Sequence, residues 1–198
     1  KEWAHEQHSR FSAFIDALKA AGVTFNIHHC CNSAGTLELP DFHREMIRPG
    51  IIQYGYDASK EVLVTGTKIK PVMSLRCCIT HLKTIYEGDC VGYGRHFTAK
   101  GPTKIATLPI GYADGYNRAL SSKIDVIVHG VRAHQVGNIC MDQCMIDIGP
   151  SPWVQRWDEV CIFGPHQGDN TAETLAALSH TIPYEITCSI NKRVPRLF

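Results

Sequence analysis

The sequence lacks an excess of charge of either sign and lacks any long apolar run. Its 198 residues include 20 Lys and Arg against 19 Asp and Glu, a formal net charge of +1. Such a chain presents no strong field toward nucleic acid or an anionic membrane, so both partner classes are excluded. No uncharged apolar stretch approaches the roughly 18 residues of a membrane-spanning helix, and the opening KEWAHEQHSR is unlike a signal peptide. We therefore expect a soluble, cytoplasmic protein.

Spacings typical of disulfide frameworks and metal sites are also missing, although the chain has nine cysteines. Nine is an odd number, and the adjacent pairs Cys30–Cys31 and Cys77–Cys78 fit no obvious bridging scheme, so reduced thiols are expected. The run of residues 28–31, HHCC, suggests a metal site. However, neither CxxC nor HExxH occurs, and Cys140 and Cys144 are spaced wrongly for a zinc knuckle. We expect packed cysteines there and no metal.

Hydrophobic periodicity divides the chain into two parts. Residues 1–68 alternate helix and strand patterns, which is typical of an α/β domain with a parallel sheet. Two strands of such a sheet expose both faces, so this part is expected to be the end of a larger α/β domain that precedes residue 1. The elements predicted here are a helix over 2–21 ended by Gly22, a strand over 23–28, a short helix over 41–46 and a strand over 47–52.

Residues 69–198 carry many short strand patterns separated by glycine-containing turns. This pattern predicts an all-β domain, a barrel or a sandwich. Asn170 is predicted to cap a helix that follows the strands, and Pro183 to open a final helix through Ile190. The predicted strands lie within 72–85, 104–110, 124–128, 135–148 and 159–163, with turns at 87–89, 114–115 and 129–130.

Four short segments combine glycine with a hydroxyl or an aromatic ring. They are NSAG at 32–35, RPGI at 48–51, GYG at 92–94 and GYADG at 111–115. Small residues let a ligand approach the backbone, and a serine hydroxyl beside free N–H groups suits a phosphate. Taken singly, each segment is as readily a tight turn with a surface ring.

Taken together and in order, these segments and their surroundings resemble the C-terminal half of alanine racemase, a fold-type III enzyme that uses pyridoxal 5'-phosphate. The resemblance runs from about residue 28 to the C-terminus. It implies that residues 1–68 are the last βα units of a TIM barrel and that residues 69–198 form the family's β-barrel-like C-terminal domain. The matching pieces are HCCNSAG, IRPGIIQYG, PVMSLRC, EGDCVGYGRHF, LPIGYADGYNR, GNICMDQCMIDI and IPYEITCSINKRVPR.

The resemblance also implies which residues hold the cofactor. Ser33, the backbone of Gly50 and Ile51, and the Tyr184 hydroxyl match the family's phosphate contacts. Arg48 matches the arginine that faces the pyridine nitrogen; its permanently charged guanidinium should leave that nitrogen unprotonated and limit side reactions. The alternatives are an ordinary ion pair for the arginine and a helix-start ring in the core for the tyrosine.

Racemisation needs one acid/base group on each side of the substrate Cα. Tyr93 matches the family's catalytic tyrosine, which acts in the partner subunit's active site of a homodimer. A free tyrosine has a pKa near 10, so its use as a base requires positive charge or hydrogen-bond donors nearby. The family usually has serine where this chain has Gly92.

Three further residues match the substrate site. Met141, through its backbone N–H, and Asp142 match the segment that contributes to the substrate carboxylate site, and Tyr112 matches an aromatic residue at the entrance. All three would also act across the dimer. The alternative is that Met141 is a core strand residue and that Tyr112 packs across strands.

The lysine that carries the cofactor in the family is missing, because no lysine here precedes a tyrosine by four residues. The chain alone is therefore expected to be inactive. We interpret it as the C-terminal portion of a racemase that interconverts L- and D-alanine by two-base proton transfer and supplies D-alanine for peptidoglycan. Two alternatives stay open: a serine racemase of the glycopeptide-resistance type, which Tyr184 disfavours, and a non-catalytic dimerisation β-domain, which Tyr93, Arg48 and Ser33 disfavour.

Overall fold

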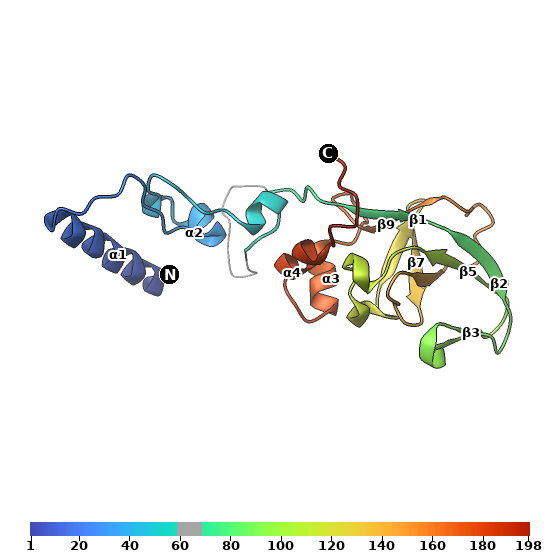
Figure 1. The fold of residues 1–198 in the computed structure, drawn as a ribbon. Helices are drawn as coiled ribbons and strands as arrows, with labels where there is room; N and C mark the ends of the chain where they lie inside the picture. The colour runs from blue at the N-terminus through green and yellow to red at the C-terminus, as the bar shows by residue number, and fades with distance from the viewer. Residues whose placement is uncertain (59–68) are drawn as a thin grey trace. The chain divides into compact units, whose positions relative to one another are not determined.

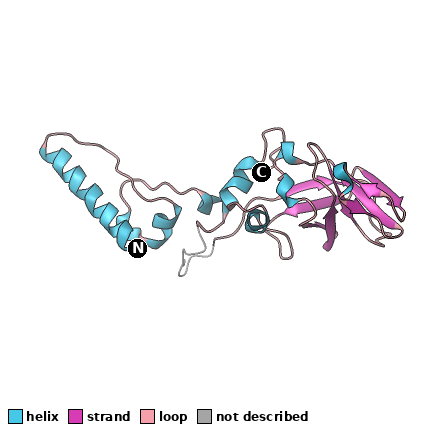
Figure 2. Ribbon diagram, turned by 90° about the horizontal axis from the view of Figure 1, so that it is seen from below, coloured by secondary structure: helices cyan, strands magenta, loops and turns pink. Residues whose placement is uncertain are grey.

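The computed structural model describes residues 1–58 and 69–198 and divides the chain into two compact units, Lys1–Lys70 and Pro71–Phe198 (Figure 1). Within the described residues, every strand belongs to the second unit (Figure 2). The domain boundary predicted after residue 68 falls at the edge of residues 59–68, outside the described residues, and stays a prediction.

The first unit is built around one long helix. Helix α1 (Glu2–Ala20) confirms the predicted amphipathic helix, and it ends before Gly22, whose φ of +83° is a left-handed conformation that glycine adopts without strain. The ring of His8 stacks on buried Phe42 with centroids 4.0 Å apart, which holds the helix on the segment that follows. The remaining elements of this unit are α2 (Ser33–Glu38) and the 3₁₀ helices η1 (Pro40–Phe42) and η2 (Ile51–Tyr54).

Three local predictions for this unit are wrong. Residues 23–28 and 47–50 are irregular, and residues 51–54 form η2. Of the helix predicted over 41–46, only the end of η1 at residues 41–42 is present, and α2 lies upstream. A parallel strand exists only where a neighbouring strand pairs with its backbone, and no described residue pairs with 23–28 as a strand. The side chains of Val23, Phe25 and Ile27 are exposed accordingly.

The second unit contains a seven-stranded antiparallel sheet in the order β1-β9-β6-β7-β8-β5-β2. Its strands confirm the predicted all-β domain, because each predicted stretch overlaps one or two of them, although most of the strand at residues 131–136 precedes the predicted stretch 135–148. They are β1 (Leu75–Cys78), β2 (His81–Ile85), β5 (Thr103–Leu108), β6 (Asp125–Val128), β7 (Val131–Val136), β8 (Cys144–Asp147) and β9 (Glu159–Phe163).

The two end strands of this sheet are consecutive in the chain, which forces the sheet to curl. Only Ile79 and Thr80 separate β1 from β2. The N–H of Ile79 donates to the carbonyl of Asp158 beside β9, whereas the N–H of Thr80 donates to the carbonyl of Thr107 in β5. Two consecutive N–H groups therefore bond to opposite ends of the sheet. The fully buried side chain of Ile79 fills the inside of the bend between β1 and β2.

Turn chemistry sets the register of the β6–β7 hairpin. His129 and Gly130 have φ values of +49° and +77°, the pair of left-handed residues that a two-residue type I′ turn requires. This turn twists in the same sense as the strands that it joins. The turn predicted at 129–130 is therefore confirmed, as is the turn at 87–89, where Gly88 has φ +86°.

Helices α3 (Ala172–Leu178) and α4 (Pro183–Ser189) follow the sheet, and Pro183 opens α4 as predicted. The predicted cap of α3 is one residue off, because the Thr171 hydroxyl, not Asn170, accepts the N–H of Thr174. Asn170 is buried instead, and its side-chain amide donates to the carbonyls of Asp125 (2.7 Å) and Ile162 (3.1 Å). Satisfying strand carbonyls in the interior takes precedence over capping, since a buried unpaired carbonyl is costly.

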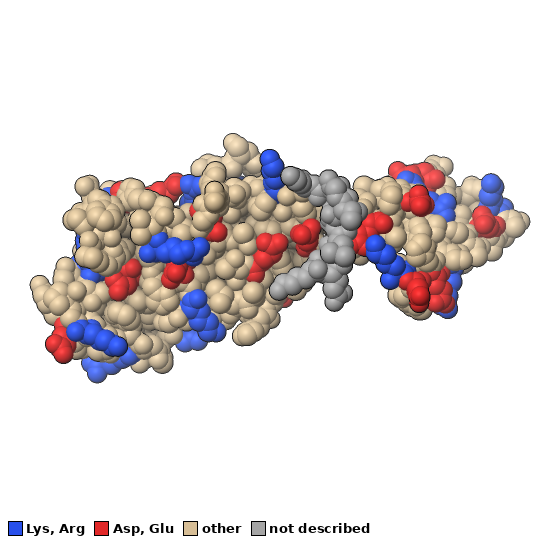
Figure 3. Space-filling view, turned by 180° about the vertical axis from the view of Figure 1, so that it is seen from behind, with Lys and Arg blue, Asp and Glu red and all other residues tan. Residues whose placement is uncertain are grey.

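Charged side chains of both signs lie on the surface. On the face shown in Figure 3, Lys and Arg are interspersed with Asp and Glu, without a patch of one sign. No helix among the described residues is long and apolar enough to span a membrane.

All nine cysteines have free thiols. Burial raises the pKa of Cys77 to about 12, so this thiol stays protonated and unreactive at neutral pH.

Replacing Ile79 tests the curl of the sheet. Ile79→Ala removes three carbons from the inside of the β1–β2 bend, and we expect it to lower the free energy of unfolding by about 2–5 kcal/mol because a cavity remains. Urea unfolding followed by circular dichroism measures this. Val131→Ala, at a half-exposed strand position, is the control and should cost less than about 1 kcal/mol. Equal losses for the two variants would contradict this account of the bend.

Candidate functional site

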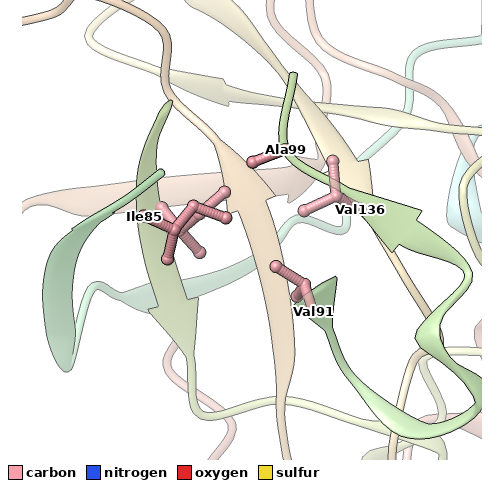
Figure 4. Close-up of a cluster of buried hydrophobic side chains, with 5 residues drawn as sticks. Ile85, Val91, Ala99 and Val136 are labelled. Atoms are coloured by element: carbon pink, nitrogen blue, oxygen red, sulfur yellow. The ribbon is translucent and has the colours of Figure 1, made fainter. Parts of the chain in front are cut away.

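Tyr93 lies at the tip of a short hairpin formed by β3 (Cys90–Val91) and β4 (Phe97–Thr98). The base of the hairpin is fixed in the interior: Val91 and Ala99 pack in a buried apolar cluster with side chains of the main sheet (Figure 4). The tip, in contrast, leaves the Tyr93 side chain 78% exposed. The fold therefore presents this hydroxyl to the surroundings on an anchored loop.

Glycines fix the conformation of this loop. Gly92 has φ +75° and ψ 178°, a region that residues with a side chain rarely enter. Gly94 has φ +76°, and a Cβ there would lie 2.6 Å from Nε2 of His96. The carbonyl of Tyr93 accepts a hydrogen bond from the side-chain amide of Asn138 (2.8 Å). Glycine at position 92 thus suits the conformation that this loop adopts.

Four of the predicted site residues meet around one cavity. Tyr93, Tyr112, Met141 and Asp142 line a depression of about 390 Å³ in the second unit, together with Arg118 and other residues of the 138–143 loop. They come from three segments of the sequence, so their convergence is a property of the fold. The roles predicted for them stay predictions.

Two loops are joined through their backbones: residues 111–115, the Tyr112 segment, and residues 138–143, the Met141 loop. The N–H groups of Tyr112 and Ala113 donate to the carbonyls of Cys140 and Met141, each at 3.0 Å. A Cβ on Gly111 would lie 2.2 Å from the carbonyl oxygen of Cys140, so only glycine permits this approach. Among the described residues, no acceptor takes the N–H of Met141, which is thus available to a ligand carboxylate.

Arg193 and Asp114 form a contact that the sequence patterns do not predict. Arg193 donates from Nε to Oδ1 of Asp114 (2.7 Å) and from Nη2 to Oδ1 of Asp142 (2.6 Å). The other oxygen of Asp114 accepts the N–H of Gly111 (2.9 Å). The matching piece IPYEITCSINKRVPR contains this arginine, but its spacing along the chain gives no indication of two partners 79 and 51 residues away.

The predicted phosphate residues of the first unit also lie together. Ser33 is buried, and its hydroxyl oxygen accepts the N–H of Gly50 (2.9 Å), so the hydroxyl proton is directed elsewhere. Within the part of the chain that the structure describes, the N–H of Ile51 has no acceptor. Arg48 donates its backbone N–H to the carbonyl of Cys31 (2.9 Å) and its guanidinium to the carbonyl of Cys30 (3.2 Å).

Tyr184 belongs to the other unit of the chain. It is half-buried on α4 of the second unit, whereas Ser33, Gly50 and Ile51 belong to the first unit. Neither unit by itself brings the tyrosine to the serine, so its predicted phosphate contact stays a prediction.

His28, the first residue of the HHCC run at residues 28–31, contacts Glu45. The carboxylate of Glu45 accepts the backbone N–H of His28 (2.8 Å) and lies 2.9 Å from its ring Nδ1. No group of three or more His, Cys, Asp or Glu side chains in residues 1–58 and 69–198 is arranged to hold a metal ion.

Both units of the chain match models of a known protein family. The family model for the alanine racemase C-terminal domain matches residues 72–198, and that for the N-terminal domain matches residues 1–58. An alanine racemase of Treponema denticola is 48% identical over all of this chain and 52% of that protein, and alanine racemase 1 of Clostridium acetobutylicum is 46% identical with the same coverage. The chain thus spans about half the length of the curated relatives that it matches.

Solved structures agree. The alanine racemase of Clostridium difficile 630 in complex with cycloserine has a TM-score of 0.90 at 39% identity, over 98% of this chain and 51% of that one. The Bacillus anthracis alanine racemase with bound L-Ala-P has a TM-score of 0.92 at 35% identity, over 100% and 51%. These structures confirm the predicted fold class, the last part of a TIM barrel followed by a β-barrel-like domain.

The close approach at Gly111 predicts a steric effect on the cavity. Gly111→Ala places a Cβ on the Cys140 carbonyl and should lower the free energy of unfolding by about 1–3 kcal/mol, because the two loops must separate. Gly101→Ala is the matched control, since nothing lies within 4 Å of a Cβ there, and should change stability by less than about 0.5 kcal/mol. Thermal unfolding of both variants measures this, and a neutral Gly111→Ala would show that the loops are not in contact.

The Glu45 contact predicts an acid titration. Hydrogen bonds from backbone N–H groups, first that of His28, lower the pKa of Glu45 from 4.5 to about 2. Because the folded pKa lies below the unfolded one, the contact stabilises the protein above pH 4.5, and this stabilisation is lost as the pH falls toward 2. A carbon NMR titration of the Glu45 carboxyl should give a midpoint near 2. His28→Ala keeps the backbone donor and should retain most of the shift; a wild-type midpoint near 4.5 would refute the contact.

Proposed function

This chain belongs to the alanine racemase family, and from that premise we propose that it is the C-terminal part of an enzyme that interconverts L- and D-alanine. One observation carries the proposal: Tyr93, Tyr112, Met141 and Asp142, which match the family's catalytic and substrate residues, converge on a single cavity of about 390 Å³. A non-catalytic dimerisation domain would have no need to keep these four side chains together with the Ser33–Gly50 contact of the first unit.

The cavity suits a small amino acid. The free N–H of Met141 is a donor for the substrate carboxylate, and Tyr112 flanks the same space. The exposed phenol of Tyr93 can face a ligand that lies outside its own unit. These features support an active site in which Tyr93, Tyr112 and Met141 of one subunit serve the substrate held by another subunit of a homodimer.

The residues of the first unit fit the phosphate of pyridoxal 5'-phosphate. The Ser33 hydroxyl has a proton to donate and the Ile51 N–H has no other acceptor, so two donors are available beside Gly50. When bound, this cofactor supplies the electron sink that makes the α-proton of an amino acid removable. Arg48 would face its pyridine nitrogen as a permanently charged donor, and Tyr184 would add a further phosphate contact.

The proton transfer follows from these positions. Tyr93 exchanges a proton with one side of the substrate Cα, and a second base is needed on the other side. None of the lysines of this chain precedes a tyrosine at the family's spacing, so the second base and the cofactor attachment must come from the rest of the enzyme. In the whole protein, the reaction would take place in the cytoplasm and supply D-alanine for peptidoglycan.

Replacing the catalytic hydroxyl tests the function. With the chain supplied with the N-terminal half that the relatives have, Tyr93→Phe should lower kcat for racemisation in both directions by roughly 10²–10⁴-fold, the contribution of one general acid/base group. Cofactor absorbance should be unchanged, because Tyr93 is not a cofactor contact. Racemisation is followed by optical rotation with L-alanine, D-alanine and L-serine as substrates.

Tyr86→Phe is the control, because it removes the hydroxyl of another exposed tyrosine and should leave kcat unchanged. Full activity of Tyr93→Phe would exclude the assigned role. Faster turnover of serine than of alanine by the unmodified enzyme would replace the proposed substrate with serine.

A further inference from the structure

Arg193 connects the two loops that form the carboxylate end of the cavity. It lies in the tail after α4, beyond the residues predicted to have a role. Its Nε binds Asp114, which ends the Tyr112 segment, and its Nη2 binds Asp142, which follows Met141. One guanidinium thus bridges carboxylates from two loops that both line the proposed substrate site.

The end of α4 and the tail after it, residues 190–198, are held on the Tyr112 segment by further contacts. The N–H of Asn191 donates to the carbonyl of Asp114 (3.0 Å), and the Ser189 hydroxyl donates to the carbonyl of Gly115 (3.3 Å). Gly115 has φ +103°, and a Cβ there would lie 2.5 Å from the Ser189 carbonyl oxygen. Arg193 therefore projects from a fixed base, and Asp114, only 9% exposed, is a fixed partner.

Charge gives this bridge a second consequence. The N–H of Met141 is the proposed donor to the substrate carboxylate, and the next residue, Asp142, carries a negative charge. An unpaired carboxylate at that position repels an incoming carboxylate, whereas a carboxylate bound to a guanidinium does so much less. A planar guanidinium can direct two N–H groups at two separate acceptors, which a single ammonium group does less well.

We propose that Arg193 is a positioning residue that holds the Tyr112 segment and the Met141–Asp142 loop at a fixed separation and neutralises Asp142, so that the cavity accepts the carboxylate of an amino acid. This inference rests on the proposed function and deepens it. It differs from a general structural role because it predicts an effect on substrate binding that exceeds the effect on turnover.

The test separates position from charge. Arg193→Lys keeps the positive charge but loses the simultaneous contact with Asp114 and Asp142. Arg193→Gln loses both the charge and this double contact. In the enzyme completed with its N-terminal half, Arg193→Lys should raise KM for L-alanine roughly tenfold, about the effect of one lost charge-assisted hydrogen bond, while kcat changes less than about threefold. Arg193→Gln should raise KM further.

Arg196→Lys is the matched control. Arg196 lies three residues away and donates only to backbone carbonyls, those of Ile190, Asn191 and Val194, so KM should stay at the wild-type value. An unchanged KM in Arg193→Lys, a fall in kcat as large as the rise in KM, or the same rise in KM in Arg196→Lys would overturn the proposal.

Hydrogen exchange of the completed enzyme without substrate gives a readout that does not depend on catalysis. The amides of Tyr112 and Ala113, which bond to the Met141 loop, should exchange faster in Arg193→Lys than in wild type or Arg196→Lys. Asp142→Asn, which removes the exposed partner alone, should show the same direction with a smaller effect. If the completed wild-type enzyme fails to racemise alanine, the proposed function fails, and equal exchange in all variants separately overturns the bridge.

Discussion

The close contact between the backbones of residues 111–113 and 140–141 is the constraint on which the candidate site depends. Two N–H groups of the first segment bond to carbonyls of the second, and the contact is possible only because residue 111 is glycine. This pairing uses the carbonyl of Met141 and leaves its N–H directed elsewhere. It also brings Tyr112 and Asp142 to one cavity, and Arg193 connects the two loops a second time through Asp114 and Asp142.

The position of Tyr93 at the cavity depends on a different set of contacts. The hairpin that carries Tyr93 has only two residues in each strand, too few to be stable alone. It is held because Val91 and Ala99 belong to a buried apolar cluster of the main sheet and because Asn138 binds the Tyr93 carbonyl. Asn138 is part of the same loop as Met141, so the phenol and the proposed carboxylate donor are positioned by one connected set of contacts.

Sequence patterns predicted the second unit well, because antiparallel strands are joined by local turns whose residues have specific backbone requirements. His129 and Gly130 are an example, since both adopt the left-handed conformation that the turn needs. The same reasoning failed for residues 23–28, whose alternating apolar side chains need a distant strand that the described residues do not supply. Asn170 was mistaken for a helix cap because its spacing is right for a cap, whereas its actual partners, Asp125 and Ile162, are remote in sequence.

For the candidate site, the ordered motifs predict Tyr93, Tyr112, Met141 and Asp142, which line one cavity, whereas spacing alone does not point to Arg193. The most direct test of the account is a crystal structure of the completed enzyme with a carboxylate-bearing alanine analogue. We expect a carboxylate oxygen within about 3 Å of the Met141 nitrogen, and the Tyr93 hydroxyl of the same subunit facing the analogue's Cα beside a cofactor held by the other subunit. An analogue bound away from the Met141 loop, or a Tyr93 hydroxyl directed to bulk solvent in that complex, would contradict the account.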